Sequence, residues 1–157
     1  ELSRMNEQNW QIICADARDI NLLPPETVDL IVTSPPYNLG KPYDRYNDNV
    51  SEQEWRQLLR QVLHNCFVWS KVGGRLCLNL PIAGHSAAIK NNTNVTERYN
   101  AMVAGYEEAI NSGWKYRYII LWLRYYTQTT SAHRIGTFRS ARAPYIINNC
   151  EVIWVFY

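Results

Sequence analysis

The chain has 157 residues, which is long enough for one domain with a hydrophobic core, and 46% of them are apolar. This composition excludes a disordered tail, and a formal net charge of +2 does not by itself indicate a nucleic-acid-binding protein. No apolar run approaches the roughly 18 residues of a membrane-spanning helix, and no signal peptide is visible. The four cysteines and three histidines lack metal-site spacing. We expect a cytoplasmic protein that holds no metal ion.

Short apolar segments alternate with longer periodic ones along the chain. The short segments are rich in β-branched or aromatic residues and predict strands over residues 11–14, 28–33, 75–80, 115–123 and 151–157. Apolar residues at helical spacing predict helices over 52–69 and 96–111. Ser51 and Glu54 form a capping box at the start of the first helix, and Gly73-Gly74 is interpreted as a turn.

This order of elements predicts an α/β fold with a mainly parallel sheet and helices on both faces. In such sheets, ligands bind beyond the carboxyl ends of the strands. Two polar segments follow predicted strands and are therefore expected at that edge. They are Ser34-Pro35-Pro36-Tyr37, after strand 28–33, and Asn79-Leu80-Pro81, after strand 75–80.

The segment Ser34-Pro35-Pro36-Tyr37 is restricted by its prolines. Each proline fixes its own φ and favours an extended conformation in the preceding residue, so Ser34 and Pro35 are both held extended. Because proline has no N–H group, the segment offers hydroxyl and carbonyl acceptors, followed by the aromatic face of Tyr37. This edge suits an exocyclic amino group, which has two N–H donors. Hydrogen bonds to the Ser34 oxygen and the Pro35 carbonyl would hold both hydrogens.

Such hydrogen bonds would direct the nitrogen lone pair at an electrophilic methyl group. If the amino group belongs to a nucleic-acid base, Tyr37 would stack on that base after it leaves the double helix. Because serine is not a strong base, we expect the amine to attack first and to lose its proton late.

The sequence of residues 28–38 resembles the hallmark of the amino-methyltransferases that modify DNA at cytosine N4 or adenine N6. This hallmark is Asp, Asn or Ser followed by Pro-Pro-Tyr at the end of a strand. Similar segments lie at Ala15-Asp16, Asn79-Leu80-Pro81, 113–116 and 151–156. The resemblance thus covers nearly the whole chain, and it implies a Rossmann-like fold that binds S-adenosylmethionine.

The resemblance also implies the roles of individual residues. The catalytic residues would be Ser34, Pro35, Pro36 and Tyr37. The cofactor would be contacted by Asp16, through the adenine amino group or a ribose hydroxyl, and by Ser34, Pro36 and Asn79. An ordinary turn or a helix cap is the alternative role for Asp16, and a strand-end turn is the alternative for Asn79.

One segment that the family uses is not found in the sequence. The family binds the methionine part of S-adenosylmethionine with a Gly-rich strand and loop, and the seven glycines of this chain form no such loop. In the family's permuted order, that loop and a target-recognition region follow the catalytic half. Residues 1–157 are therefore interpreted as the catalytic half alone, completed by a C-terminal segment or a second chain. In the family's sheet, the Gly-rich strands lie between the strand before Asp16 and the strand before Ser34.

Residues 124–149 form a long basic loop in the sequence. These 26 residues contain four arginines, one histidine, six Ser or Thr, and no Asp or Glu. We expect contact with DNA phosphates, with a solvated loop as the alternative. The residues proposed to bind DNA are Lys41, Arg134, Arg139 and Arg142. Residues 39–50, just after the motif, are expected to form a flap over the flipped base.

The sequence supports a site-specific DNA methyltransferase, of the kind found in restriction-modification systems, with double-stranded DNA as its partner. Ser34 favours cytosine N4 over adenine N6, because the adenine enzymes more often carry Asp at this position. Methylation of RNA or of a protein glutamine is a weaker alternative, since Asn is more usual there. A non-catalytic nucleic-acid-binding remnant without a cofactor site is the alternative from another class.

Overall fold

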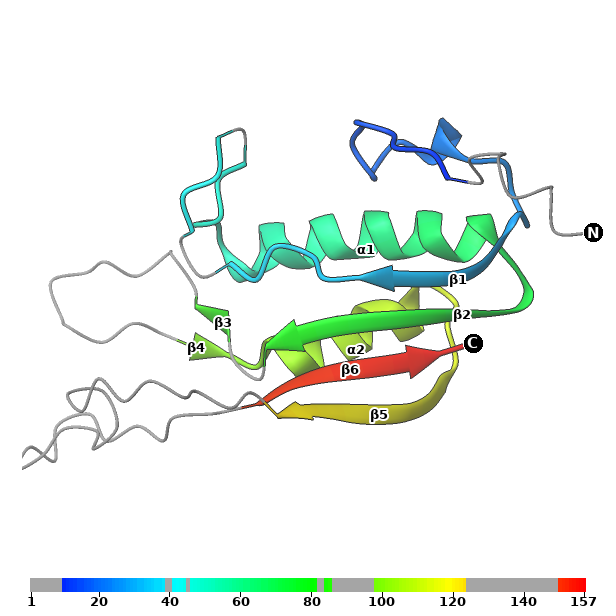
Figure 1. The fold of residues 1–157 in the computed structure, drawn as a ribbon. Coiled ribbons are helices and arrows are strands. Elements are labelled where there is room, and N and C mark those ends of the chain that lie inside the picture. The colour runs from blue at the N-terminus through cyan, green and yellow to red at the C-terminus, as the bar shows by residue number, and fades with distance from the viewer. Residues whose placement is uncertain (1–9, 39–40, 45, 82–83, 86–97, 124–149) are drawn as a thin grey trace, which may run out of the picture.

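The computed structural model describes residues 10–38, 41–44, 46–81, 84–85, 98–123 and 150–157 (Figure 1). Its four-stranded sheet has the order β1 (Val28–Thr33), β2 (Ser70–Pro81), β6 (Cys150–Phe156) and β5 (Tyr116–Leu123). A small second sheet pairs β3 (Gly84–His85) with β4 (Arg98–Tyr99). The helices are α1 (Glu52–Trp69), α2 (Ala101–Asn111) and the 3-10 helix η1 (Ile20–Leu22).

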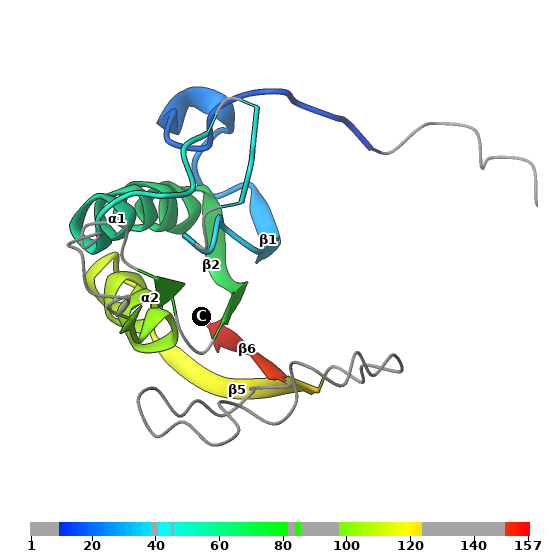
Figure 2. The same cartoon turned by 90° about the vertical axis from the view of Figure 1, so that its left-hand side faces the viewer.

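The fold is α/β, as predicted, but the directions of its strands differ from the expected mainly parallel sheet. β1 and β2 are parallel, whereas β6 is antiparallel to both of its neighbours, β2 and β5. The three strands β1, β2 and β5 therefore point the same way, as the sequence predicts. The sheet is mixed rather than mainly parallel, because β6 inserts between β2 and β5 in the opposite direction. The two long helices lie on one face of this sheet and not on both (Figure 2).

Helix α1 forms as its pattern predicts. The Ser51 side chain accepts from the backbone N–H of Glu54, and the Glu54 side chain accepts in return from the backbone of Ser51. The periodic apolar face is buried, with Trp55 and Leu59 fully inaccessible. Phe67 lies at the rim of this core, where it makes an edge contact with Trp114. No helix in the described part of the chain is long and apolar enough to cross a membrane.

Helix α2 packs against the core through both small and large side chains. Ala104, Gly105, Glu108 and Ala109 are buried, and Met102 and Tyr106 are partly buried against the core, whereas Val103 and Ile110 are exposed. A Cβ atom added at Gly105 would lie 2.1 Å from Leu80 Cδ1, so a larger residue here would require Leu80 to shift. The helix is also shorter than expected and begins at Ala101.

Two other predictions about local structure are wrong. Gly73-Gly74 is not a turn between elements but lies inside β2, where the register against β1 shifts between Val28 and Leu30. Gly73 has φ +84°, which glycine adopts without steric cost and which produces this irregularity. Residues 11–14 form no strand, and their backbone is irregular and exposed. A strand needs a hydrogen-bonded neighbour, and the described residues offer none to this segment.

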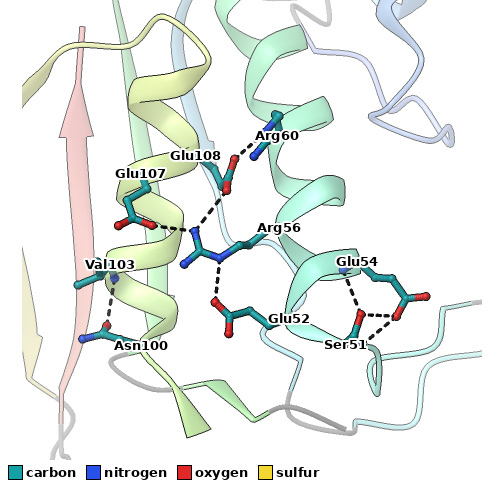
Figure 3. Close-up of polar contacts among 9 residues, drawn as sticks. All are labelled: Ser51, Glu52, Glu54, Arg56, Arg60, Asn100, Val103, Glu107 and Glu108. Carbon is teal, nitrogen blue, oxygen red and sulfur yellow. Dashed lines mark hydrogen bonds and ion pairs between the residues drawn. The ribbon is translucent and has the colours of Figure 1, made fainter. Parts of the chain in front are cut away.

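An ion cluster joins the two long helices (Figure 3). Glu108 on α2 is buried, with 2% of its side chain exposed, and it accepts from Arg60 at 2.8 Å and from Arg56 at 3.3 Å. Arg56 also contacts Glu107 on α2 and Glu52 on α1, both at 2.8 Å. The buried carboxylate is therefore neutralised by two guanidinium groups on the opposite helix, which fixes the position of α2 relative to α1.

Replacing Glu108 tests this coupling of the helices. Glu108→Gln should lower the free energy of unfolding by about 1–2 kcal/mol, because two guanidinium groups lose their shared charged partner. This value is below that of a fully buried pair, because both arginines are partly solvated. Glu107→Gln is the matched control, since its side chain is 50% exposed, and it should change stability by less than about 0.5 kcal/mol. Equal unfolding midpoints in urea for the two variants would contradict the assignment.

Candidate active site

Three strand ends meet at one edge of the sheet. The segment Ser34–Tyr37 follows the carboxyl end of β1, and Asn79 lies near the carboxyl end of β2. Because β6 runs in the opposite direction, its amino end lies at this same edge, and Glu151 pairs with Pro81 across the sheet. The edge predicted from parallel-sheet geometry therefore receives a carboxylate from an antiparallel strand.

Four side chains form a hydrogen-bonded group that we call the Tyr37 cluster: Ser34, Tyr37, Asn79 and Glu151. The hydroxyls of Ser34 and Tyr37 lie 2.9 Å apart, and the Tyr37 hydroxyl donates to Glu151 Oε2 at 3.1 Å. Asn79 Nδ2 donates to the Tyr37 oxygen at 2.7 Å and to Glu151 Oε2 at 2.8 Å. Ser34 is exposed, whereas Glu151 is buried, so the cluster leads from the surface into the sheet.

The backbone of the motif is fixed from the helix side. The indole N–H of Trp55 donates to the Pro36 carbonyl at 2.7 Å, and the Trp55 side chain is fully buried in the core. The Trp55 ring packs against Tyr99, with ring centroids 5.3 Å apart, and burial raises the pKa of Tyr99 to about 12. The first turn of α1 therefore holds the motif through the Trp55 indole, which is fixed by its packing in the core.

Asn38 closes the loop that follows the motif. Its backbone has φ +55°, a left-handed conformation that asparagine tolerates better than most residues. Its side-chain amide donates to the Val50 carbonyl and accepts from the Val50 N–H, each at 2.9 Å. Buried Asp48 accepts from the backbone N–H groups of Asn38 at 2.8 Å and of Lys41 at 3.0 Å. Both ends of the expected flap are thus tied together, with exposed Lys41 near its start.

Asp16 lies in an exposed turn away from the Tyr37 cluster. Its carboxylate accepts from the backbone N–H of Arg18 at 2.9 Å and from the Arg18 guanidinium, and these hydrogen bonds lower the pKa of Asp16 to about 2. The carbonyl of the next residue, Ala17, accepts from Asn65, ten positions after Trp55 on α1. Trp55, which holds the motif, and Asn65, which holds the segment of Asp16, are therefore about 15 Å apart along the helix axis. The turn role considered for Asp16 is present in the structure.

The structure thus brings together three of the residues selected from the sequence, Ser34, Tyr37 and Asn79. Arg134, Arg139 and Arg142 lie outside the described residues. Sequence reasoning missed Glu151, although a visible signal was available. Glu151 is the single charged residue of the strand Cys150–Phe156, which is otherwise apolar and is buried in the sheet. Among the described residues, no group of three or more His, Cys, Asp or Glu could hold a metal ion.

Comparison with known proteins identifies the class to which this fold and site belong. Residues 28–157 match the family of N6- and N4-methyltransferases, which is described as DNA methylase. The chain therefore belongs to this DNA methylase family. It is 37% identical over 135 residues to Type II methyltransferase M.MjaVI of Methanocaldococcus jannaschii, covering 86% of this chain and 64% of that protein. It is 34% identical over 58 residues to Type II methyltransferase M.HpaI of Haemophilus parainfluenzae, covering 36% of this chain and 18% of that protein.

Solved structures show the same fold. A putative DNA modification methylase from Thermus thermophilus, complexed with S-adenosyl-L-methionine, has a TM-score of 0.60 at 21% identity. The cytosine-N4-specific PvuII DNA methyltransferase has a TM-score of 0.59 at 16% identity. Each match covers 90% of this chain, but only 50% and 46%, respectively, of the solved chains. The chain thus has the fold of about half of each of these methyltransferases, and it spans less than two thirds of the length of the curated relatives.

Two substitutions at Asn38 test the closure of the loop. Asn38→Gly and Asn38→Ala both lose the side-chain hydrogen bonds to Val50, which should reduce stability by about 1–3 kcal/mol. Asn38→Ala should be less stable than Asn38→Gly by about 1 kcal/mol, because alanine is strained at positive φ and glycine is not. Chemical denaturation of both variants gives the comparison. If alanine is as stable as glycine, the backbone of Asn38 is not left-handed.

Proposed function

We propose that the protein transfers a methyl group from S-adenosylmethionine to the exocyclic amino group of a flipped base in DNA, with cytosine N4 favoured. The observation that carries this proposal is the exposed Ser34 hydroxyl, presented on a proline-restricted backbone that is fixed on both sides. Trp55 holds the Pro36 carbonyl, and the Tyr37 cluster holds the Ser34 side chain. Rigid placement of an acceptor is what amine methylation requires, because the reaction depends on orientation.

The proposed chemistry uses the two acceptors of the motif. The Ser34 oxygen and the Pro35 carbonyl accept the two N–H groups of the target amine, which directs its lone pair away from the ring and toward the methyl group. The nitrogen–carbon bond forms first, and the amine then becomes acidic enough to lose a proton. In this role Ser34 does not need to act as a strong base. Tyr37 presents its ring to the base, while its hydroxyl stays within the Tyr37 cluster.

The described residues fit part of the cofactor. The exposed Asp16 carboxylate is suited to accept from an adenine amino group or a ribose hydroxyl, in competition with Arg18. Ser34 and Pro36 would line the region near the reacting methyl group, and Asn79 would act there through Tyr37. S-adenosylmethionine supplies the electrophilic methyl group. The sequence of residues 1–157 contains no Gly-rich loop for the methionine part of the cofactor. We therefore propose that another segment binds this part.

Double-stranded DNA is the proposed partner. Lys41 lies at the start of the closed loop after the motif, where its ammonium group can reach a phosphate near the flipped base. Arg134, Arg139 and Arg142 are proposed to contact further phosphates, as the absence of acidic residues from 124–149 indicates. Restriction-modification is the corresponding biological setting, and the curated relatives with Type II names support it.

The proposed activity is tested on the complete enzyme, which includes the segment with the Gly-rich loop, with DNA and S-adenosylmethionine carrying a labelled methyl group, followed by nucleoside analysis of the product. We expect labelled N4-methylcytosine, and labelled N6-methyladenine would instead assign the alternative base. Ser34→Ala should slow transfer about tenfold to a hundredfold, because it removes one hydrogen bond to the reacting amine. The control is the thermal stability of the variant, which should not change, because Ser34 is exposed.

Two results would contradict this proposal. Transfer of label to RNA or protein but not to DNA would exclude the substrate class. Equal rates for the native protein and Ser34→Ala in an active preparation would exclude the role of the Ser34 hydroxyl.

We further propose that additional strands, carrying the Gly-rich cofactor loop, pair with β1. Among the described residues, β1 has a neighbour on one side only and forms one end of the sheet (Figure 2). Leu30 and Val32 on this strand are 57% and 73% exposed. An edge strand with unpaired backbone groups and exposed apolar side chains favours pairing with a further strand. A C-terminal segment or a second chain would provide it.

Cofactor binding provides a test of this completion. Residues 1–157 alone should bind S-adenosylmethionine weakly or not at all in calorimetry, because the loop for the methionine part is missing. Addition of a polypeptide that carries the Gly-rich segment should produce binding in the micromolar range or tighter. Micromolar binding by a monomer of residues 1–157 would contradict the proposal.

A further inference from the structure

The direction of the hydrogen bonds in the Tyr37 cluster follows from the groups that form it. The Glu151 carboxylate can only accept, and the Tyr37 hydroxyl has a single proton, which it donates to Glu151 Oε2 at 3.1 Å. The Tyr37 oxygen then accepts from Asn79 Nδ2 at 2.7 Å, and it lies 2.9 Å from Ser34 Oγ. With its own proton committed to Glu151, Tyr37 acts as the acceptor in its contact with Ser34. Ser34 is therefore the donor.

This direction determines what Ser34 presents to the outside. Its single proton points inward to Tyr37, so its lone pairs are directed toward the exposed surface. A hydroxyl in that state can only accept from a group bound outside. An exocyclic amine offers N–H donors and therefore matches it, whereas an outward-pointing Ser34 proton would oppose an N–H donor.

We propose that Glu151 is a positioning residue for methyl transfer, which acts through Tyr37 to keep the Ser34 hydroxyl in its accepting orientation. Without the carboxylate, the Tyr37 proton loses its acceptor on Glu151 and can turn toward Ser34 Oγ, which reverses the hydrogen bond and turns the Ser34 proton outward. Asn79 supports the same direction, because its Nδ2 donates to both Tyr37 and Glu151. This inference rests on the proposed function, in which Ser34 accepts from the target amine.

The backbone places Glu151 for this role. In the antiparallel register of β2 and β6, Pro81 pairs with Glu151 and Asn79 pairs with Ile153, so Asn79 and Glu151 are diagonal neighbours on one face of the sheet. Glu151 is 6% exposed, and burial of a carboxylate is costly unless it is hydrogen-bonded. The hydrogen bonds from Tyr37 and Asn79 provide that compensation, and their geometry is therefore maintained in the folded protein.

Steady-state kinetics of the complete enzyme, with DNA and S-adenosylmethionine, test the inference. Glu151→Ala should lower kcat about tenfold to a hundredfold and leave KM for both substrates within about twofold, because Ser34 is still present but misoriented. Glu151→Gln should recover most of the lost rate, since its amide oxygen can still accept from Tyr37 and Asn79. Asp29→Asn, at an exposed carboxylate on β1 that contacts Lys71, is the matched control and should have native kcat.

Tyr37→Phe provides a second variant in case Glu151→Ala does not fold. It removes one hydroxyl, keeps the aromatic face that meets the base, and deprives Ser34 of its acceptor. It should therefore lower kcat, and in a folded Glu151→Ala background it should add little further loss, because both changes act through the same hydrogen bond.

The outcomes separate this inference from the proposed function. Native kcat in Tyr37→Phe, or independent and multiplicative losses in the double variant, would overturn the positioning role while methyl transfer to DNA remains. A Glu151→Gln variant as slow as Glu151→Ala would also overturn it, because the charge rather than the accepted hydrogen bond would then matter. Absence of methyl transfer by the native complete enzyme would instead contradict the proposed function itself.

Discussion

The antiparallel pairing of β6 with β2 is the constraint on which the candidate active site depends. Through this pairing, the amino end of β6 lies at the carboxyl edge of β1 and β2, and Glu151 is brought beside Asn79. A parallel strand in the same place would begin at the opposite edge and would bring no side chain here from its first residues. The site is thus assembled from two strand ends and one strand beginning. In this protein the Tyr37 cluster therefore depends on the antiparallel direction of β6.

Helix α1 connects the parts of the site that the sheet alone does not fix. Its first turn holds the segment Ser34–Tyr37 through Trp55 and Pro36, and its last turns hold residues 17–20 through Asn65 and Trp69. One rigid element therefore sets the separation between Ser34 and the segment that contains Asp16. The Glu108 ion cluster then fixes α2 against α1, which is the helix that holds the segment Ser34–Tyr37.

The sequence predicts those features that depend on local order, and fails for those that depend on neighbours in space. The capping box and the periodic stripe of α1 are local, as is the proline-restricted segment after β1, and each is found as expected. The insertion of β6 involves residues about 75 positions from β2 in the sequence, so no local pattern shows it. The same holds for Gly105 on α2, whose close approach to Leu80 of β2 depends on residues far apart in the sequence. Glu151 stands out locally as the single charged residue of β6, but its position beside Asn79 follows only from the pairing of β2 with β6.

The irregular backbone of residues 11–14 has the same physical cause as the open side of β1. The segment has strand-forming residues, yet Ile12 is 82% exposed and no described strand pairs with it. On β1, Val32 points an apolar side chain into solvent at the end of the sheet. Strand propensity is expressed only where a neighbour supplies hydrogen bonds and a surface to pack against. The segment before Asp16 and the strand before Ser34 thus have the same property: each has strand-forming residues that lack a neighbour on at least one side among the described residues.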